Sequence, residues 1–196
     1  MGMMRGLCGL TLALLLAGCV PNTVRQGDMA TFDFGDPLGG WPAPALRGVT
    51  VAAPSWLGTA AMQYRLDGSE PSRRRAFADS RWAAPPAELL EQALRRRALA
   101  TDAGAALPCR LRVDLDEFVQ AFDAAQSSRI VLAVRASLLC RDEQPAASRS
   151  FVVERPAGGD ARSGVAAASL AVQDLSAKLA GWVAAEKSAL ATRRKE

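Results

Sequence analysis

The sequence predicts an α/β (α+β) fold in which a mainly antiparallel sheet with a long hairpin packs against two main helices. Three observations predict this fold. Residues 109–141 alternate between apolar and polar side chains over two strand lengths. Residues 85–100, and the region after Ser163, carry apolar side chains at helical spacings of three and four. The chain has 196 residues, of which 22% are charged, so one modest domain is expected.

The long hairpin is the most informative stretch, and a turn between residues 124 and 125 fixes its register. Glu117 would then face Leu132, so a bulge is expected within residues 116–118. The register otherwise pairs apolar residues, opposite charges and two cysteines across the strands: Leu111 with Leu138, Asp114 with Arg135, and Cys109 with Cys140.

Shorter strands are expected on both sides of this hairpin, each bounded by turn residues. The Asp67-Gly68 pair is expected to turn the chain after one of them. Residues 73–75 are three consecutive arginines, and two interpretations stay open for them: a solvated loop run or a partner-binding patch. The predicted strands cover residues 31–34, 49–53, 62–66, 76–78 and 149–155.

Two helices carry clear boundary signals. Pro85 and Pro86 suit a first helical turn, and the pattern continues to about Ala100. Ser163 is expected to cap the final helix, which should lie across the sheet. Trp182 is assigned to the core rather than to a ligand site. The apolar stripe of this helix comprises Val165, Ala168, Val172, Leu175, Leu179, Trp182 and Val183.

The first residues are typical of a bacterial lipoprotein. Arg5 supplies a positive start, and the apolar run that follows, residues 7–18, is shorter than the roughly 20 residues that span a bilayer. Leu16-Ala17-Gly18-Cys19 forms a lipobox, so residues 1–18 are predicted to be a signal peptide and Cys19 to be acylated. The alternative is an ordinary cleaved signal followed by a chance cysteine.

The mature chain divides into three parts. Residues 19–31 are predicted to be the lipidated N-terminus and linker, residues 32–190 a single domain, and residues 191–196 a basic tail. Two or three acyl chains would anchor the protein stably in a membrane, facing the periplasm. Val20 stands where aspartate favours retention in the inner membrane, so the outer membrane is favoured.

The four cysteines separate by position. Cys8 leaves with the signal peptide and Cys19 is acylated, so Cys109 and Cys140 remain. A leftover pair in an oxidising compartment is more often a disulfide than a metal site. Together with the hairpin register, this predicts a Cys109–Cys140 bridge.

The residues that common chemistries need are missing. The sequence contains no histidine, which excludes Ser-His-Asp and Cys-His catalysis and histidine-ligated metals. Asp114, Asp116 and Glu117 are clustered, but strand alternation favours solvated carboxylates or cross-strand ion pairs over a catalytic pair. We therefore expect no enzyme activity, no catalytic residue, no metal and no cofactor. Arginines interleave with acids, so a nucleic-acid partner is not indicated.

The chain resembles the ABC-type transport auxiliary lipoprotein family from about residue 30 to residue 188. Besides the lipobox, the resemblance rests on the strand at residues 62–66, the segment Asp79-Ser80-Arg81-Trp82-Ala83-Ala84-Pro85-Pro86-Ala87-Glu88-Leu89-Leu90, and a strand that ends in Phe118. The positions that match the family motif are Tyr64, Arg65, Arg81, Trp82 and Pro86.

The resemblance implies an adaptor rather than a catalyst. Members of this family, such as the paraquat-inducible lipoprotein, accompany MCE-type systems that move lipids between membranes. The implied partners are an MCE-domain protein and an ABC permease and ATPase, with a homo-oligomer left open. The motif positions either maintain the fold, with Trp82 buried beside a helix start and Arg81 bonded to chain ends, or form a docking surface. Two other functions stay open: a stand-alone lipid-binding lipoprotein and an outer-membrane assembly lipoprotein resembling the lipopolysaccharide-assembly one.

Overall fold

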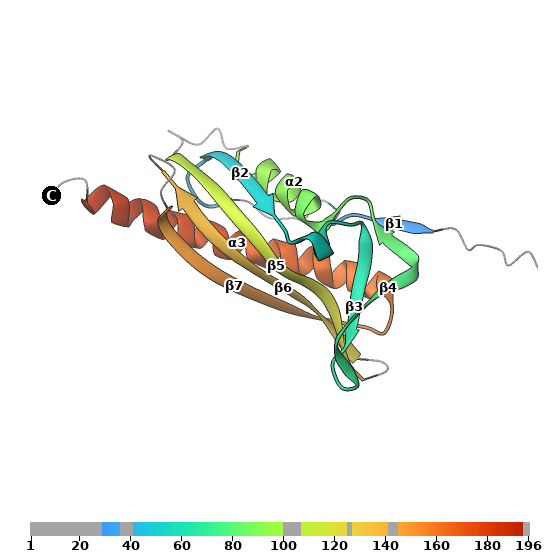
Figure 1. Ribbon diagram of the computed structural model, residues 1–196. Coiled ribbons are helices and arrows are strands. Elements are labelled where there is room, and N and C mark those ends of the chain that lie inside the picture. Colours follow the sequence, from blue (N-terminus) through green and yellow to red (C-terminus); the bar gives the residue numbers. More distant parts are fainter. Residues whose placement is uncertain (1–28, 36–40, 100–106, 125–126, 141–144, 194–196) are drawn as a thin grey trace, which may run out of the picture.

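A computed structural model of the chain describes a single sheet covered by helices on one face (Figure 1). The described residues are 29–35, 41–99, 107–124, 127–140 and 145–193. The elements, in chain order, are β1 (Ala30–Phe32), β2 (Leu46–Ala52), the 3-10 helix η2 (Ser55–Leu57), β3 (Ala61–Leu66), β4 (Glu70–Trp82), α2 (Pro86–Ala98), β5 (Leu107–Ala124), β6 (Ser127–Leu139), β7 (Pro145–Ala157) and α3 (Ala161–Arg193).

The sheet is mixed, with its longest pairings antiparallel. The strand order is β1-β4-β3-β5-β6-β7, and β2 also pairs with β5. The β3–β4, β5–β6 and β6–β7 pairs are antiparallel, whereas β1–β4, β2–β5 and β3–β5 are parallel. The predicted α/β fold with a mainly antiparallel sheet and a long hairpin is therefore confirmed.

The edge of β5 that faces away from β6 is shared between two strands. β2 pairs with β5 as far as Asp114, and β3 pairs with it from Gln120 onwards. Between these stretches β5 carries a bulge, where the register shifts between Leu115 and Glu117. This is the bulge that the sequence predicts, and it turns Phe118 into the core, where the side chain is 4% exposed.

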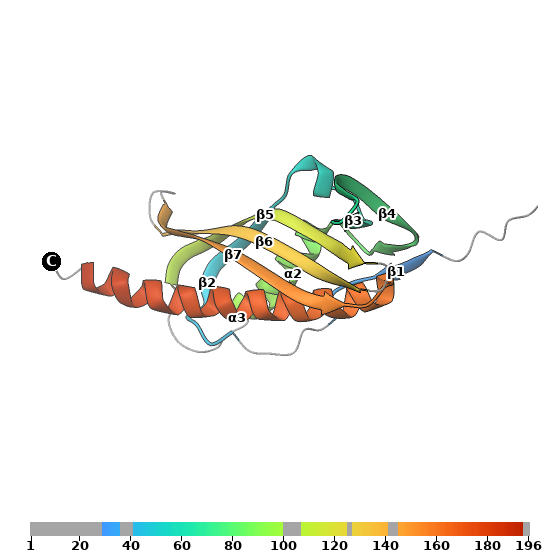
Figure 2. The ribbon, with the colours of Figure 1, turned by 90° about the horizontal axis from the view of Figure 1, so that it is seen from below.

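Both helices lie on the same face of the sheet (Figures 1 and 2). α3 lies across β6 and β7, as predicted, and α2 covers β2. Every second residue of β6 is buried under the helices, from Ile130 to Leu138, whereas Arg135 on the opposite face is exposed. The predicted stripe of α3 is buried except for Val165, which packs partly against the core. This alternation is what the apolar pattern of the hairpin predicts.

The predicted hairpin register is confirmed from Arg110 to Leu115, but beyond the bulge it shifts, and the strands close with Ala124 beside Ser127, one residue later than predicted. The ion pair of Arg135 also has a different acid from the one expected. Leu111 faces Leu138 and Asp114 faces Arg135, as expected. Arg135 nevertheless donates to both carboxylate oxygens of Asp116, at 2.8 Å each. Asp114 instead accepts hydrogen bonds from Arg112. Asp116 lies two residues after Asp114 on the same face of β5, at the bulge, and has no backbone partner on β6. Its carboxylate is therefore available to Arg135.

Several element boundaries differ from the predictions, and β2 and β7, for example, begin at Leu46 and Pro145 rather than at residues 49 and 149. The larger differences concern β4 and α3. The strand expected at residues 76–78 is the thirteen-residue β4, so the three arginines lie within a strand rather than in a loop. Their charges are offset by acids, since Arg74 pairs with Glu117. The cap of α3 is Asp160, whose carboxylate accepts a 2.7 Å hydrogen bond from the Ser163 backbone N–H; Ser163 itself stands inside the first turn. α3 continues through Arg193, into the segment expected to be a tail.

Candidate functional site

Trp82 joins the sheet to α2. It is the last residue of β4 and 3% exposed, and its ring lies 5.2 Å from the ring of Phe34 and 5.4 Å from that of Phe118. Pro86 follows as the first residue of α2, where its fixed backbone suits a helix start and its missing N–H costs no hydrogen bond. Two of the five motif positions therefore lie buried at the junction between the sheet and α2.

Arg81, next to Trp82, points the other way. Its side chain is exposed, and its Nε donates to the Thr31 hydroxyl of β1 at 3.2 Å. The sequence predicts a bond to chain ends, whereas the partner is a side chain on the neighbouring strand. Because Arg81 is exposed and makes one side-chain hydrogen bond there, it is the motif residue most accessible to a partner.

Arg65 belongs to a cluster on the sheet face opposite the helices. Glu117 at the bulge accepts hydrogen bonds from Arg65 Nη1 at 3.1 Å, from Arg74 Nη1 and Nη2 at 2.9 and 2.7 Å, and from the Phe118 backbone N–H at 2.9 Å. The Glu117 side chain is 16% exposed. These bonds tie the β3–β4 hairpin to β5, so Arg65 has a structural partner.

Tyr64 lies on β3 two residues after the buried Met62, and so on the helix-covered side of the sheet. Its ring centre stands 4.8 Å from that of Phe77 on β4 and 5.7 Å from that of Phe122 on β5. These rings and Leu66 form the apolar wall of an open groove of about 570 Å³, which we call the aromatic groove. The residues that line it are Tyr64, Leu66, Gly68, Ser69, Phe77, Phe122, Asp123 and Gly159.

Sequence reasoning identifies Tyr64 but misses the rest of this groove. Phe77 sits in a strand predicted to be only three residues long, and Phe122 falls in the register on the face that carries charges. The bulge in β5 reverses that assignment and turns Phe122 toward Tyr64. A second aromatic residue spaced four positions after Phe118 is the signal that could have revealed it.

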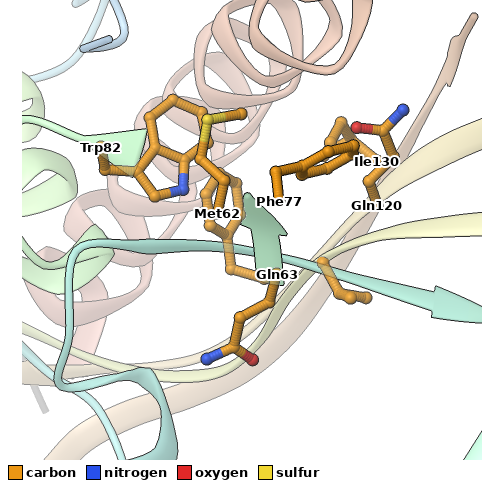
Figure 3. Close-up of a pocket in the computed structure, with 8 residues that line it drawn as sticks. Met62, Gln63, Phe77, Trp82, Gln120 and Ile130 are labelled. Atoms are coloured by element: carbon orange, nitrogen blue, oxygen red, sulfur yellow. The ribbon is translucent and has the colours of Figure 1, made fainter. Parts of the chain in front are cut away.

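The interior next to the groove is filled. A cavity of about 10 Å³, room for one water molecule, lies among side chains of β3, β4, β5 and β6 (Figure 3). Figure 3 shows Met62 beside the Trp82 indole and the Gln63 side chain pointing away from both. The residues that line this cavity are Met62, Gln63, Phe77, Trp82, Phe118, Val119, Gln120 and Ile130.

The clustered carboxylates are held in ion pairs. Hydrogen bonds from the Arg135 guanidinium lower the pKa of Asp116 below its usual value, whereas a general acid needs a raised pKa. Glu117 and Asp114 bond to arginines as described above. Within the described ranges, no three His, Cys, Asp or Glu side chains converge where a metal ion could bind.

The two predicted modification sites have different places in the structure. Cys19 lies outside the described residues. Cys109 lies in β5 just before Arg110, where the pairing with β6 begins, and Cys140 follows β6. The structure joins the two cysteines by a disulfide with the Sγ atoms 2.11 Å apart. Cys109 is buried, at 2% exposed. Oxidation of this pair in the cell stays a prediction.

Residues 36–180 match the model of a family described as the ABC-type transport auxiliary lipoprotein component. The chain belongs to this family. Its members are membrane-anchored lipoproteins of the cell envelope that accompany an ABC transport system, and this chain shares that general assignment. A comparison with curated proteins finds no match. None of the helices in the described residues is both long and apolar enough to cross a membrane.

Solved structures of similar fold support the architecture. A Xanthomonas campestris protein of the family DUF330 is 20% identical, with a TM-score of 0.65 over 85% of this chain and 98% of its own. A second, uncharacterised protein is 16% identical, with a TM-score of 0.60 over 80% of this chain and 99% of its own. At these identities the likeness concerns the fold alone. The matched regions include nearly the whole length of both solved proteins, so the auxiliary lipoprotein resembles each of them over a whole domain.

Proposed function

We propose that this auxiliary lipoprotein is an adaptor, anchored by acylated Cys19, for an ABC transport system that moves lipids or other hydrophobic molecules between the inner and outer membranes. The family match over residues 36–180 carries the proposal. The lipobox upstream of it supplies the anchor. In this proposal the domain faces the periplasm, favours the outer membrane, and contacts an MCE-domain protein with its permease and ATPase.

The filled interior supports an adaptor over a carrier that encloses its cargo. A protein that carries a lipid in its core needs a cavity of several hundred Å³. The cavity beside Trp82 measures about 10 Å³, and the larger hollows of the described domain are open to solvent. The ion-paired carboxylates likewise support a role without catalysis.

Arg81 is the motif residue we propose for docking, because it is exposed, whereas the other four are buried or half-buried. Arg81→Ala removes an exposed guanidinium and one hydrogen bond to Thr31. Arg112→Ala is the matched control, since its side chain is 57% exposed and paired with Asp114 on the same strand. Both variants should keep the wild-type melting temperature, because exposed pairs contribute little to stability.

In-cell crosslinking of the full-length protein tests the proposal. An MCE-domain protein and the permease should be recovered with the wild type and with Arg112→Ala, and in smaller amounts with Arg81→Ala. Recovery of an outer-membrane barrel protein without any MCE-domain protein would reject the proposal in favour of an assembly lipoprotein. Equal recovery of these partners with the wild type, Arg112→Ala and Arg81→Ala would reject only the docking role of Arg81.

A further inference from the structure

The aromatic groove has the chemistry of a binding site for an apolar chain. Its walls are the rings of Tyr64, Phe77 and Phe122 and the side chain of Leu66. Asp123 is the charged residue among those that line it, and its carboxylate pairs with Arg129 at the rim. At about 570 Å³ the groove lies within the usual range of ligand sites, roughly 300 to 1,000 Å³.

Other hollows of the described surface have charged walls. One of about 280 Å³ beside η2 is lined in part by Asp114, Asp116 and Arg135. Another, of about 470 Å³ beside α2, is lined in part by Glu91 and Arg95. An acyl chain that entered either hollow would desolvate several charged groups, whereas Asp123 is the one charged residue among the described residues that line the aromatic groove, so the free-energy cost is smaller there.

The course of β1 places the groove near the anchor. β1 pairs in parallel with β4, with Ala30 beside Ser80. The chain therefore enters β1 from the direction of the earlier residues of β4, which include Phe77. Phe77 precedes Ser80 by three residues, roughly 10 Å along a strand. β1, the β3–β4 hairpin and the first turn of α3 share one end of the domain, and the C-terminal end of α3 lies at the other (Figure 1).

The length of the linker keeps that end close to the membrane. Residues 19–28 separate the lipidated position from the first described residue, Met29. Ten residues span at most about 35 Å even when fully extended. α3, with its 33 residues, extends about 50 Å away from that end. An anchor at Cys19 therefore brings the groove end, rather than the C-terminal end, to the bilayer.

We propose that the aromatic groove binds an acyl chain of a phospholipid in the membrane to which Cys19 anchors the domain. The inference rests on the lipid attachment in the proposed function and names the lipid contact made there. Because the groove is open, it holds one chain along Tyr64, Phe77 and Phe122 while the headgroup stays at the interface. Tyrosine suits this boundary, since its ring is apolar and its hydroxyl is polar.

Photo-crosslinking in vesicles tests the site. The full-length acylated protein is reconstituted into phosphatidylethanolamine and phosphatidylglycerol vesicles that contain phosphatidylethanolamine with a diazirine in one acyl chain. After illumination and digestion, mass spectrometry should find lipid adducts on peptides that contain Tyr64, Phe77 or Phe122. Phe77→Ser, and separately Leu66→Ser, should reduce these adducts by about tenfold, the effect of losing one buried apolar side chain.

Val152→Ser is the matched control, because this residue is 59% exposed on β7 and remote in sequence from the groove. Its adducts and its melting temperature should equal those of the wild type. Circular dichroism should show that Phe77→Ser and Leu66→Ser are folded, with a lower melting temperature for Phe77→Ser, which loses its ring contact with Tyr64. Adducts spread evenly over the surface, or groove adducts unchanged in both groove variants, would overturn the site. If the mass of the protein confirms acylation but the groove carries no adducts, the site is also overturned. This outcome includes the case in which an acyl chain of the anchor on Cys19 fills the groove instead of a phospholipid. Loss of the transport partners in cells leaves these adducts unaffected, so the two proposals fail separately.

Discussion

Arg74 and Glu117 form a two-pronged ion pair across the bulge of β5, with Nη1–Oε1 and Nη2–Oε2 distances of 2.9 and 2.7 Å. Such bidentate geometry is the stronger kind of arginine–carboxylate contact. Arg65 adds a third bond to the same carboxylate at 3.1 Å. β3 and β4 are thus held to β5 by side chains at the point where the backbone pairing of β5 changes from β2 to β3.

Glu117→Ala should lower the free energy of unfolding by about 2 kcal/mol, because it removes the carboxylate that two half-buried guanidinium groups share and leaves Arg65 with only the longer pair to Asp67, at 3.9 Å. Urea unfolding followed by circular dichroism measures the change. Glu154→Ala is the control: its side chain is 51% exposed and pairs with Arg129 at the surface, so its effect should stay below about 0.5 kcal/mol. Equal losses in the two variants would contradict the structural role of the cluster.

Gly164→Ala should destabilise the start of α3 by about 1 to 3 kcal/mol. A Cβ added there would stand 2.9 Å from Gln120 Cδ and closer still to its Oε1. Gln120 is 2% exposed and cannot retreat, since its Nε2 donates to Ser128 Oγ and to the carbonyls of Gly158 and Asp160.

Gly181→Ala in the same helix provides the opposite expectation. Nothing lies within 4 Å of a Cβ at this position, so the better helix propensity of alanine should stabilise the protein by about 0.5 to 1 kcal/mol. Thermal unfolding of both variants measures the contrast. A Gly164→Ala protein as stable as Gly181→Ala would show that Gln120 does not hold the position described.

The hairpin could be predicted from the sequence because its constraints are local and redundant. Apolar alternation, opposite charges and two cysteines all agree on one register for β5 and β6, and the misfit of Glu117 locates the bulge. The stripe of α3 is equally legible because seven apolar side chains share one face. In both cases the pattern is repeated often enough that a single exception does not hide it.

The aromatic groove could not be predicted in the same way. It depends on β3 lying parallel to β5, a pairing between segments far apart in the chain with no periodic signal. The full length of β4 could not be predicted, because three consecutive arginines are not typical of a strand. Their charges are offset by Glu70 and Glu117, which reach them when the strands are assembled. The position of Phe122 depends on the bulge as well, and so the site emerges only from tertiary structure.

Acid should lower the free energy of unfolding below about pH 4, and the free energy should change little between pH 7 and that value. Arg135 lowers the pKa of Asp116, the Ser163 backbone N–H lowers that of Asp160, and Arg75 lowers that of Glu70. A carboxyl whose pKa is lower in the folded state contributes stability that is complete above its unfolded pKa and is lost as pH falls through its folded pKa.

Urea midpoints between pH 7 and pH 3 test this dependence. The wild-type midpoint should be nearly constant from pH 7 down to about pH 4 and then fall. Asp160→Asn keeps a capping oxygen without the charge, so its midpoint should decline less steeply with acid. A wild-type midpoint that falls between pH 7 and pH 5 would point to a group with a raised pKa and contradict the assignment.

The Cys109–Cys140 bridge should form in the mature protein and stabilise it by about 3 to 4 kcal/mol, the loop-entropy expectation for a sequence separation of 31. The gain comes from restricting the unfolded chain, because Arg110 and Leu139 already pair beside the bridge in the folded sheet.

Mass spectrometry of the mature protein tests the bridge. Reduction should add the mass of two hydrogens, and two thiols that react with an alkylating reagent before reduction would disprove the bridge. The double variant Cys109→Ser with Cys140→Ser should unfold at lower urea than the wild type in oxidising buffer, whereas Ser137→Ala, near the same end of β6, should not. Reducing agent should bring the wild type toward the double variant and leave that variant unchanged, since only the bridged chain has a covalent loop to lose.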